Sequence, residues 1–253
     1  MPNVDALFAF DSVQPSGPWK FDAEVARVFD NMLQRSIPQY DAMRQAVFGL
    51  GSQFLRPGDT VVDLGASRGE AIAPFVDLLG EVGCFVCVEA AEPMRLVLAE
   101  RFAKQISAGT LRVVPDDLRH AYPEVKAALT LAVLTLQFTP IEHRQRIVKR
   151  IFDATRPGGA VILVEKVLGE GADISDLLVR EYHLFKQGNG YSREDVDRKA
   201  LSLEGVLVPV TARWNQELLT QAGFQQVECF WRWMNFAGWI AIIAYWAGAR
   251  EVG

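Results

Sequence analysis

A repeated alternation between short apolar runs and amphipathic segments is the feature that most constrains how this chain can fold. The apolar runs have the length and continuous hydrophobicity of buried strands, and they lie at 60–64, 84–88, 111–114, 129–136 and 160–164. The segments between them have helical spacing, and they include 70–79, 93–107 and 142–154. Repeated units of this length predict an α/β fold, with a doubly wound, mostly parallel, seven-stranded sheet of the Rossmann-like kind.

Further elements flank this core at both ends of the chain. Asp22 is a suitable N-cap for a helix that ends before Pro38, and a second helix is expected over 41–54. After the last core strand, residues 169–213 have the pattern of helices and a loop. The expected closing elements are a helix at 214–222 and two strands at 227–233 and 238–245.

We therefore expect one domain over 1–253 with four regions. They are an N-terminal helical cap (1–56), a core that holds the ligand loops (57–166), a helical insertion (167–213), and a C-terminal helix with a strand pair (214–253). Insertions in such folds often shape the substrate pocket.

The charge of the chain argues against a nucleic-acid-binding face. There are 26 basic and 31 acidic residues, and the net charge is −5, so we expect no direct nucleic-acid binding. The uncharged run 233–249 has a borderline length for a membrane span, but we interpret it as a buried strand, because Asn235 and Gly238 interrupt it. No signal peptide is visible, and cysteines are few, so we expect a cytoplasmic protein.

Two of the three cysteines form a C-x-x-C pair, Cys84 and Cys87, which could indicate a zinc or redox site. A zinc site would require a second pair of ligands, and the only other cysteine in the sequence is Cys229. Residues three apart on a strand point to opposite faces, so we interpret the pair as two small buried apolar residues. We expect no metal.

The loop Asp63-Leu64-Gly65-Ala66-Ser67-Arg68-Gly69 follows a predicted strand and opens a helical segment. Gly65 would allow a tight turn where side chains would clash with a ligand, and Gly69 would let the helix pack close to the strand. No Gly-Lys-Ser/Thr follows, so the loop is not a P-loop, and it lacks the third glycine of a dinucleotide fingerprint. By itself the loop indicates only a nucleotide-type ligand.

Three further features occur in order along the chain. Glu89 ends the next strand, where a carboxylate can accept hydrogen bonds from both ribose hydroxyls, although a solvent-facing acid is the alternative. Asp117 and Leu118 follow the third strand, near the expected position of an adenine. Arg156-Pro157-Gly158-Gly159 is expected to form a structural turn. Together with the glycine loop, these features predict a site for S-adenosylmethionine (SAM).

Several polar and aromatic side chains are candidates for chemistry. His183 in the insertion could be a general base, or a histidine that is only exposed or hydrogen-bonded. Glu165 at a strand end could be catalytic, or could cap a loop or pair with Lys166. Trp214 belongs to an aromatic-rich C-terminal region that could line a pocket or fill a core. His120 and His143 are expected at the surface.

A closer resemblance is carried by 21–30, 35–40, Leu136-Gln137-Phe138, Asn189-Gly190-Tyr191-Ser192 and Asn235-Phe236. These segments resemble the carboxy-S-adenosylmethionine synthases, bacterial enzymes that convert SAM and prephenate to a carboxylated SAM for wobble-uridine modification in tRNA. The similarity covers nearly the whole chain. It implies the fold of class I methyltransferases and a homodimer.

The resemblance also implies site residues. It places cofactor contacts at Tyr40, Gly65, Ala66, Ser67, Glu89, Ala90, Asp117 and Leu118. To these we add Asp63 and Gly69 of the glycine loop, and Val133 beside the expected sulfonium. As substrate contacts we assign Tyr182, Tyr191, Lys199, Ala200 and Trp214.

Two positions depart from that family's pattern. Val133 aligns with the family's Asn near the sulfonium, and Ala200 aligns with the Arg that pairs with the extra carboxylate. Alanine cannot form a bidentate ion pair, and Arg198 or Lys199 would have to replace it. The leading hypothesis is therefore a methyltransferase that acts on a small-molecule acceptor. The alternatives are a carboxy-SAM synthase and a SAM-binding protein without catalysis.

Overall fold

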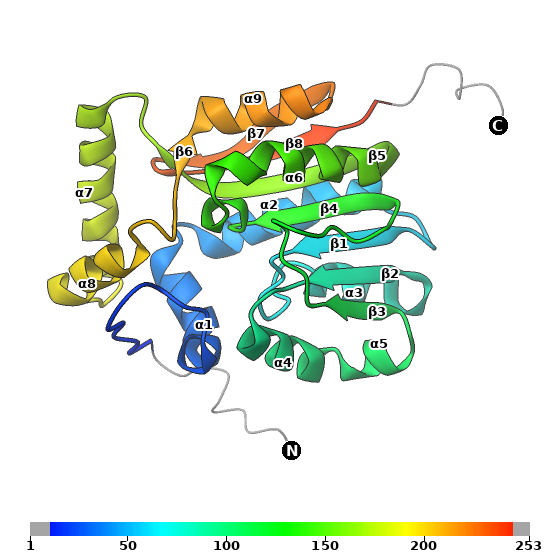
Figure 1. Cartoon of the computed structure of the whole chain (residues 1–253), viewed down its shortest axis with the longest axis horizontal. Helices are drawn as coiled ribbons and strands as arrows, with labels where there is room; N and C mark the ends of the chain where they lie inside the picture. The colour runs from blue at the N-terminus through cyan, green and yellow to red at the C-terminus, as the bar shows by residue number, and fades with distance from the viewer. Residues whose placement is uncertain (1–10, 245–253) are drawn as a thin grey trace.

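A computed structural model describes residues 11–244 (Figure 1). One sheet runs through the molecule in the order β3-β2-β1-β4-β5-β8-β7, and β6 pairs with the far end of β5. The strands are β1 (Thr60–Leu64), β2 (Cys84–Val88), β3 (Leu111–Val114), β4 (Ala127–Val133), β5 (Thr155–Leu168), β6 (Val210–Thr211), β7 (Gln226–Trp233) and β8 (Phe236–Ile242). Only β8 is antiparallel to its neighbours. This order confirms the predicted doubly wound, mostly parallel sheet.

Helices cover both faces of this sheet. The α-helices are α1 (Ala23–Ser36), α2 (Tyr40–Gly51), α3 (Ala73–Leu79), α4 (Glu92–Arg101), α5 (Ala103–Ser107), α6 (Ile141–Ala154), α7 (Ala172–Gly188), α8 (Arg193–Leu203) and α9 (Ala212–Ala222). Short 3-10 helices are η2 (Ser52–Phe54), η3 (Gly80–Val82) and η4 (Leu136–Phe138). Asp22 caps α1 as predicted, because its side chain accepts a hydrogen bond from the Val25 amide.

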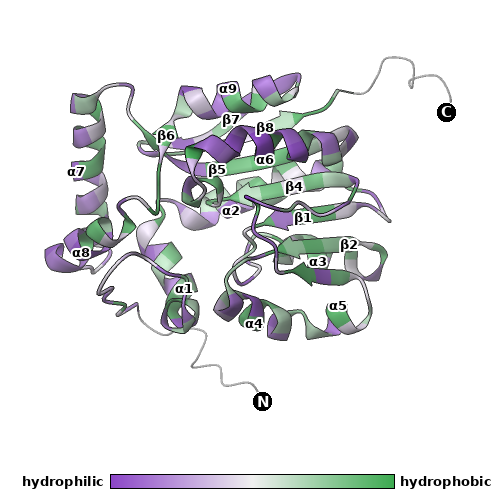
Figure 2. Cartoon of the chain, in the orientation of Figure 1, coloured by the Kyte–Doolittle hydropathy of each residue, from purple (hydrophilic) through white to green (hydrophobic). Residues whose placement is uncertain are grey.

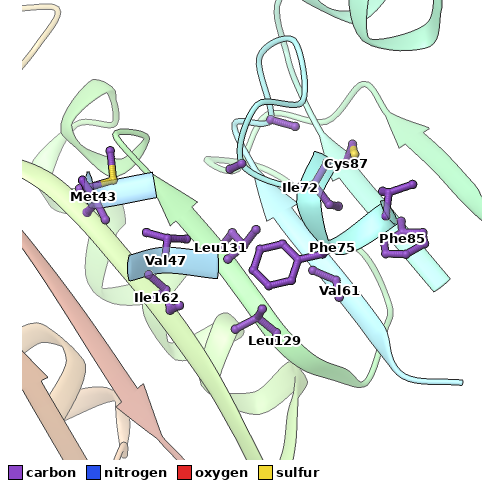
Figure 3. Close-up of a cluster of buried hydrophobic side chains, with 14 of the residues drawn as sticks. Met43, Val47, Val61, Ile72, Phe75, Phe85, Cys87, Leu129, Leu131 and Ile162 are labelled. Carbon is purple, nitrogen blue, oxygen red and sulfur yellow. The ribbon is translucent and has the colours of Figure 1, made fainter. Parts of the chain in front are cut away.

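The two faces of the sheet bury two separate apolar clusters. Helices α2 and α3 pack on one face, and Figure 3 shows Met43 and Val47 of α2 in the same buried cluster as Phe75 of α3. Helices α6 and α9 pack on the other face, where Ile147 and Leu218 are buried. Adjacent strand residues therefore enter different clusters, and the central strand β4 is largely green, that is hydrophobic, in Figure 2.

The insertion stands at one end of the sheet, where α7 and α8 lie near α1 (Figure 1). Lys166 and Leu168 end β5, the long strand that leads into it. Because α1 also lies at this end, the insertion and the N-terminal helices together cover the carboxyl ends of β1, β4 and β5. That edge is where open α/β sheets bind ligands.

Several predicted boundaries were wrong. The helix expected at 70–79 begins only at Ala73, and the helix expected at 93–107 is broken at Phe102 into α4 and α5. The turn expected at 156–159 belongs to β5, where it forms an irregularity in the pairing with β4, and Gly158 has a φ of 71°. Each error places an element end a few residues away, and none changes the topology.

The strand expected at 129–136 ends at Val133 instead. The next residue, Leu134, has a φ of 61°, which stops a strand, and the chain then enters η4. The backbone amides of this turn are bound by the carboxylate of Glu165 on β5. A side chain distant in the sequence therefore decides where β4 ends.

Other predictions concern the surface and the C-terminal run. Cys87 is buried as predicted, but Cys84 is exposed, because it begins β2 at the rim of the sheet. The uncharged run contains β8, which confirms a buried strand, while its residues 245–249 lie outside the described part of the chain. No helix within 11–244 is both long and apolar enough to span a membrane.

Candidate functional site

A cavity lies at the carboxyl ends of β1, β4 and β5, between the sheet and the helices α1, α2, α7 and α8. Its lining is Trp19, Phe21, Phe29, Met32, Leu33, Ser36, Ile37, Tyr40, Arg44, Asp63, Gly65, Ala66, Ser67, Glu70, Ala71, Val133, Leu134, Gln137, Phe138, Lys166, Tyr182, His183, Lys186, Val196, Lys199, Ala200, Leu203, Leu207 and Phe236. Most of these side chains are apolar, and the charged ones come from both sides. Such a cavity suits a small organic ligand.

The glycine loop forms the floor of this cavity. Gly65 has a φ of 65°, and a Cβ there would lie 2.5 Å from the Cγ2 atom of Thr135. Thr135 in turn donates a hydrogen bond of 2.7 Å to the Leu64 carbonyl, which fixes it against the loop. Only glycine fits this position, so the backbone stays open toward the ligand.

Gly69 also requires glycine, but for a different reason from the one predicted. Its φ is 83°, and a Cβ would lie 2.4 Å from the ring of Phe102 and 2.7 Å from Leu98. The close approach is therefore to the end of α4 and not to a strand. Gly69 does not line the cavity, and it supports the loop from behind.

Asp63 is the most unusual acid of the cavity. It is 1% exposed, and its Oδ2 atom has no hydrogen-bond partner among the described residues. Burial raises the pKa of its carboxyl to about 8, against the opposing effect of Arg44. A buried acceptor without a donor is costly, so a ligand ammonium or hydroxyl group would satisfy it.

Glu89 binds the glycine loop directly. Its carboxylate accepts hydrogen bonds from the Ser67 amide at 2.8 Å and from the Ala91 amide at 2.7 Å. Burial raises its pKa, and these two amides oppose the rise. Each carboxylate oxygen keeps a free lone pair, so ribose hydroxyls could still donate to it.

The remaining predicted cofactor contacts do not belong to the cavity lining. Ala90 is exposed, next to Glu89. Asp117 holds Arg119, whose Nε donates to Oδ2 at 2.8 Å, and this hydrogen bond lowers the Asp117 pKa. Leu118 is buried in the cluster beneath α6. The structure thus leaves the adenine position as a prediction.

Glu165 is buried and does not line the cavity. Its oxygens accept hydrogen bonds from the Leu136 amide at 2.9 Å and the Gln137 amide at 2.6 Å, so it caps the turn after β4. Among the described residues it makes no ion pair with Lys166. The capping alternative describes its contacts, and its catalytic role stays a prediction.

Of the three histidines, His183 is the one in the cavity lining, where it is half-buried. Burial lowers its pKa, and the cations Lys186 and Lys166 lower it further, so the ring is neutral near pH 7. His120 is exposed, and His143 is half-buried beside Arg146.

The insertion and α1 contribute a second polar group around Tyr191. This buried tyrosine hydrogen-bonds through its hydroxyl to Asp11, and Lys199 forms an ion pair with the same carboxylate. The guanidinium of Arg35 lies 3.9 Å from the centre of the Tyr191 ring. Lys199 reaches the cavity lining, whereas Tyr191 stands behind it.

Ala200 lines the cavity at its exposed rim. Its neighbour Arg198 does not turn inward, because its guanidinium pairs with Glu194 on the outer side of α8. Trp214 packs against the cluster of α6 and α9 on the other face of the sheet, and it does not line the cavity. Its contacts fit the interpretation that it fills the core.

Several cavity residues were missed by sequence reasoning, chiefly Arg44, Glu70, Lys186 and the aromatic residues before α1. Lys186 ends the buried stripe of α7 that also contains Tyr182. A lysine on an otherwise apolar helical stripe was the available signal. Within residues 11–244, no three His, Cys, Asp or Glu residues lie close enough together to hold a metal ion.

Comparison with known proteins agrees with this arrangement. A carboxy-S-adenosyl-L-methionine synthase of Methylococcus capsulatus is 34% identical over 88% of this chain and 92% of its own length. The enzyme of that name from Erwinia tasmaniensis is 33% identical over 96% of this chain and 99% of its own length. No family model matches the chain.

Solved structures show the same fold at lower identity. An O-methyltransferase family protein from Burkholderia thailandensis has a TM-score of 0.62 at 16% identity, over 89% of this chain and 61% of that one. A SAM-dependent methyltransferase from Aquifex aeolicus has a TM-score of 0.56 at 14% identity, over 89% of this chain and 100% of that one.

The fold and the site define a class I, SAM-dependent transferase with a methyltransferase-type domain. Within that class, the chain belongs to the carboxy-S-adenosyl-L-methionine synthase family.

Proposed function

We propose that this protein transfers a methyl group from SAM to a small-molecule acceptor bound in the cavity. The observation that carries the proposal is the rim of α8, where Ala200 lines the cavity and Arg198 points outward. The family resemblance implies an arginine at position 200 to hold a carboxylate on the transferred carbon. Alanine offers no such partner, so a carboxylate on the transferred carbon would lack the bidentate ion pair that an arginine gives.

The residues present fit SAM. The unpartnered Oδ2 of Asp63 and the open backbone at Gly65 suit a ligand that carries an ammonium group. We assign Tyr40, Ala66 and Ser67 to the same part of the ligand. Glu89 would hold the ribose, with Ala90, Asp117 and Leu118 toward the adenine.

SAM supplies an electrophilic methyl group when it is bound. The protein's contribution is to orient the acceptor and to exclude water, for which the apolar walls around Val133 and Phe138 are suited. His183 is neutral near pH 7 and faces the cavity, so a ring nitrogen can accept the proton that an acceptor hydroxyl or amine releases.

The second candidate is a carboxy-SAM synthase that uses SAM and prephenate. The names of the curated relatives favour it. Lys199 would then have to replace the arginine, yet Lys199 is already paired with Asp11. We therefore rank methyl transfer first.

We also propose a homodimer that works in the cytoplasm and does not bind nucleic acid directly. The dimer rests on the family resemblance. It is supported by the apolar residues that α7 exposes, since Ile174 is 54% and Leu184 is 58% exposed.

Two readouts test the proposed function. Mass spectrometry of the nucleoside that copurifies with the protein should find SAM or S-adenosylhomocysteine. Incubation with SAM and prephenate should then yield no carboxy-SAM. Carboxy-SAM in either experiment would contradict the proposal and establish the second candidate.

A further inference from the structure

Two lysines, one buried and one half-buried, line the cavity without an ion-pair partner among the described residues. Lys186 on α7 is 6% exposed, and Lys166 at the end of β5 is half-buried. Neither ammonium group has a hydrogen bond or a carboxylate within ion-pair distance among the described residues. Both belong to the cavity lining.

Aromatic rings link these lysines to each other. The Nζ atom of Lys166 lies 4.6 Å from the centre of the Tyr182 ring, and that of Lys186 lies 5.7 Å from the same ring. Lys186 also lies 5.1 Å from the centre of the Tyr191 ring, beyond which Lys199 is found at 4.5 Å. Ring faces attract cations, but they do not neutralise them.

The charges around the pair remain unbalanced. Arg35 and Lys199 add two further cations, while Asp11 is the carboxylate that offsets them, and it is engaged by Lys199 and Tyr191. Burial and these neighbouring cations lower the pKa of Lys186 to about 7, and burial lowers that of Lys166 to about 8. Both ammonium groups would gain from an anion.

We propose that Lys166 and Lys186 form an anion site within the cavity, and that the acceptor is a small apolar carboxylate whose charged end lies between them. This inference rests on the proposed function and names its substrate class. The surrounding lining, which includes Phe138, Leu203 and Phe236, suits the apolar body of such a molecule. The lysines bind the carboxylate of the acceptor, and a separate hydroxyl or amine of the same molecule is methylated.

The two lysines come from elements other than those that carry the polar residues assigned to the cofactor. Asp63 and Tyr40 carry the polar contacts at the β1 and α2 side, whereas the lysines belong to β5 and α7. Changing the lysines should therefore spare the cofactor. That separation makes the acceptor site testable by itself.

Phenylacetate and its neutral isostere phenylacetamide are the probes, titrated by calorimetry into the protein saturated with S-adenosylhomocysteine at pH 6.5. We expect phenylacetate to bind at least about tenfold more tightly than the amide. Lys186→Met combined with Lys166→Met should remove this preference. Lys186→Arg, which keeps the charge, should preserve it, and Arg198→Met is a matched control on the outer side of α8.

Three results would overturn the proposal. They are equal affinity for the acid and the amide, a preference that survives in the double methionine variant, and a loss of S-adenosylhomocysteine affinity in that variant. The last would assign the lysines to the cofactor. A failure of the proposed function would look different, because the acid preference would persist while the protein made carboxy-SAM.

Discussion

The cavity joins two halves that the chain builds by different means. On the side of β1 and α2, the main chain shapes the site, with Gly65 held against Thr135 and Glu89 bound to the Ser67 amide. On the side of the insertion, side chains shape it, and Lys186 lies among aromatic rings. The first half tolerates few residue types, whereas the second can change its ligand by changing single side chains. A site built in this way would allow one cofactor to serve different acceptors.

The largest effect is expected from the main-chain half. Gly69→Val would force a side chain into Phe102 and Leu98 at a φ of 83°, and we expect a loss of about 3 kcal/mol or more of unfolding free energy. Gly109→Val is the matched control, because Gly109 has a φ of 75° and no atom within 4 Å of its Cβ position. Urea unfolding of both variants measures the difference. Equal losses would show that the packing at Gly69 contributes nothing beyond backbone strain.

Glu89→Ala should weaken SAM binding by about 1–3 kcal/mol, because it removes charge-assisted hydrogen bonds to the ribose and releases the Ser67 amide. Calorimetry with SAM is the measurement. Asp117→Ala would separate the ribose from the adenine position, and we expect a smaller loss from it. Unchanged affinity in Glu89→Ala would contradict the placement of the ribose.

Ala200→Arg tests the side of the cavity that the insertion builds with its side chains. An arginine at this rim position could reach a carboxylate on the transferred carbon, so we expect carboxy-SAM binding to improve about tenfold. SAM binding should change little. An arginine that left carboxy-SAM affinity unaltered would show that position 200 does not face the transferred group.

Stability should also depend on pH through the buried lysine. The pKa of Lys186 is lowered from 10.5 to about 7, so between these values the unfolded chain binds more protons and the folded state gains stability as pH rises. Asp63 and Glu165, whose pKa values are raised to about 8, act in the opposite direction below that pH. Urea unfolding at pH 8.5 and 10 should show a smaller gain for Lys186→Met than for the unmodified protein. The same gain in both would contradict the lowered pKa of Lys186 in the folded protein.

The smallest effect concerns assembly. Light scattering at micromolar concentration should give the mass of a homodimer, and Leu177→Asp on the exposed face of α7 should shift it toward the monomer with little change in SAM affinity. Leu96→Asp, on exposed α4, is the control. A monomer mass for the unmodified protein would remove the dimer from the proposal.

Sequence reasoning reached the main-chain half more fully than the side-chain half. The glycines and Glu89 occupy fixed places relative to strand ends, so their positions follow from the alternation of strands and helices. The place of Lys186 on the stripe of α7 that also holds Tyr182 was a weak signal of its burial. The packing of Tyr182 against Phe236 and Lys166, which encloses that stripe, joins residues distant in the sequence. The end of β4 was misplaced for a similar reason, because Glu165, which is distant in the sequence, binds the amides of Leu136 and Gln137 just after Val133.

The central claim is that this family member has kept the cofactor site and lost the ability to hold a carboxylated SAM. The most direct measurement is a calorimetric comparison of SAM and carboxy-SAM on the unmodified protein. SAM should bind more tightly, by at least about tenfold, because Ala200 leaves the extra carboxylate without its partner. Equal or tighter binding of carboxy-SAM would contradict the claim.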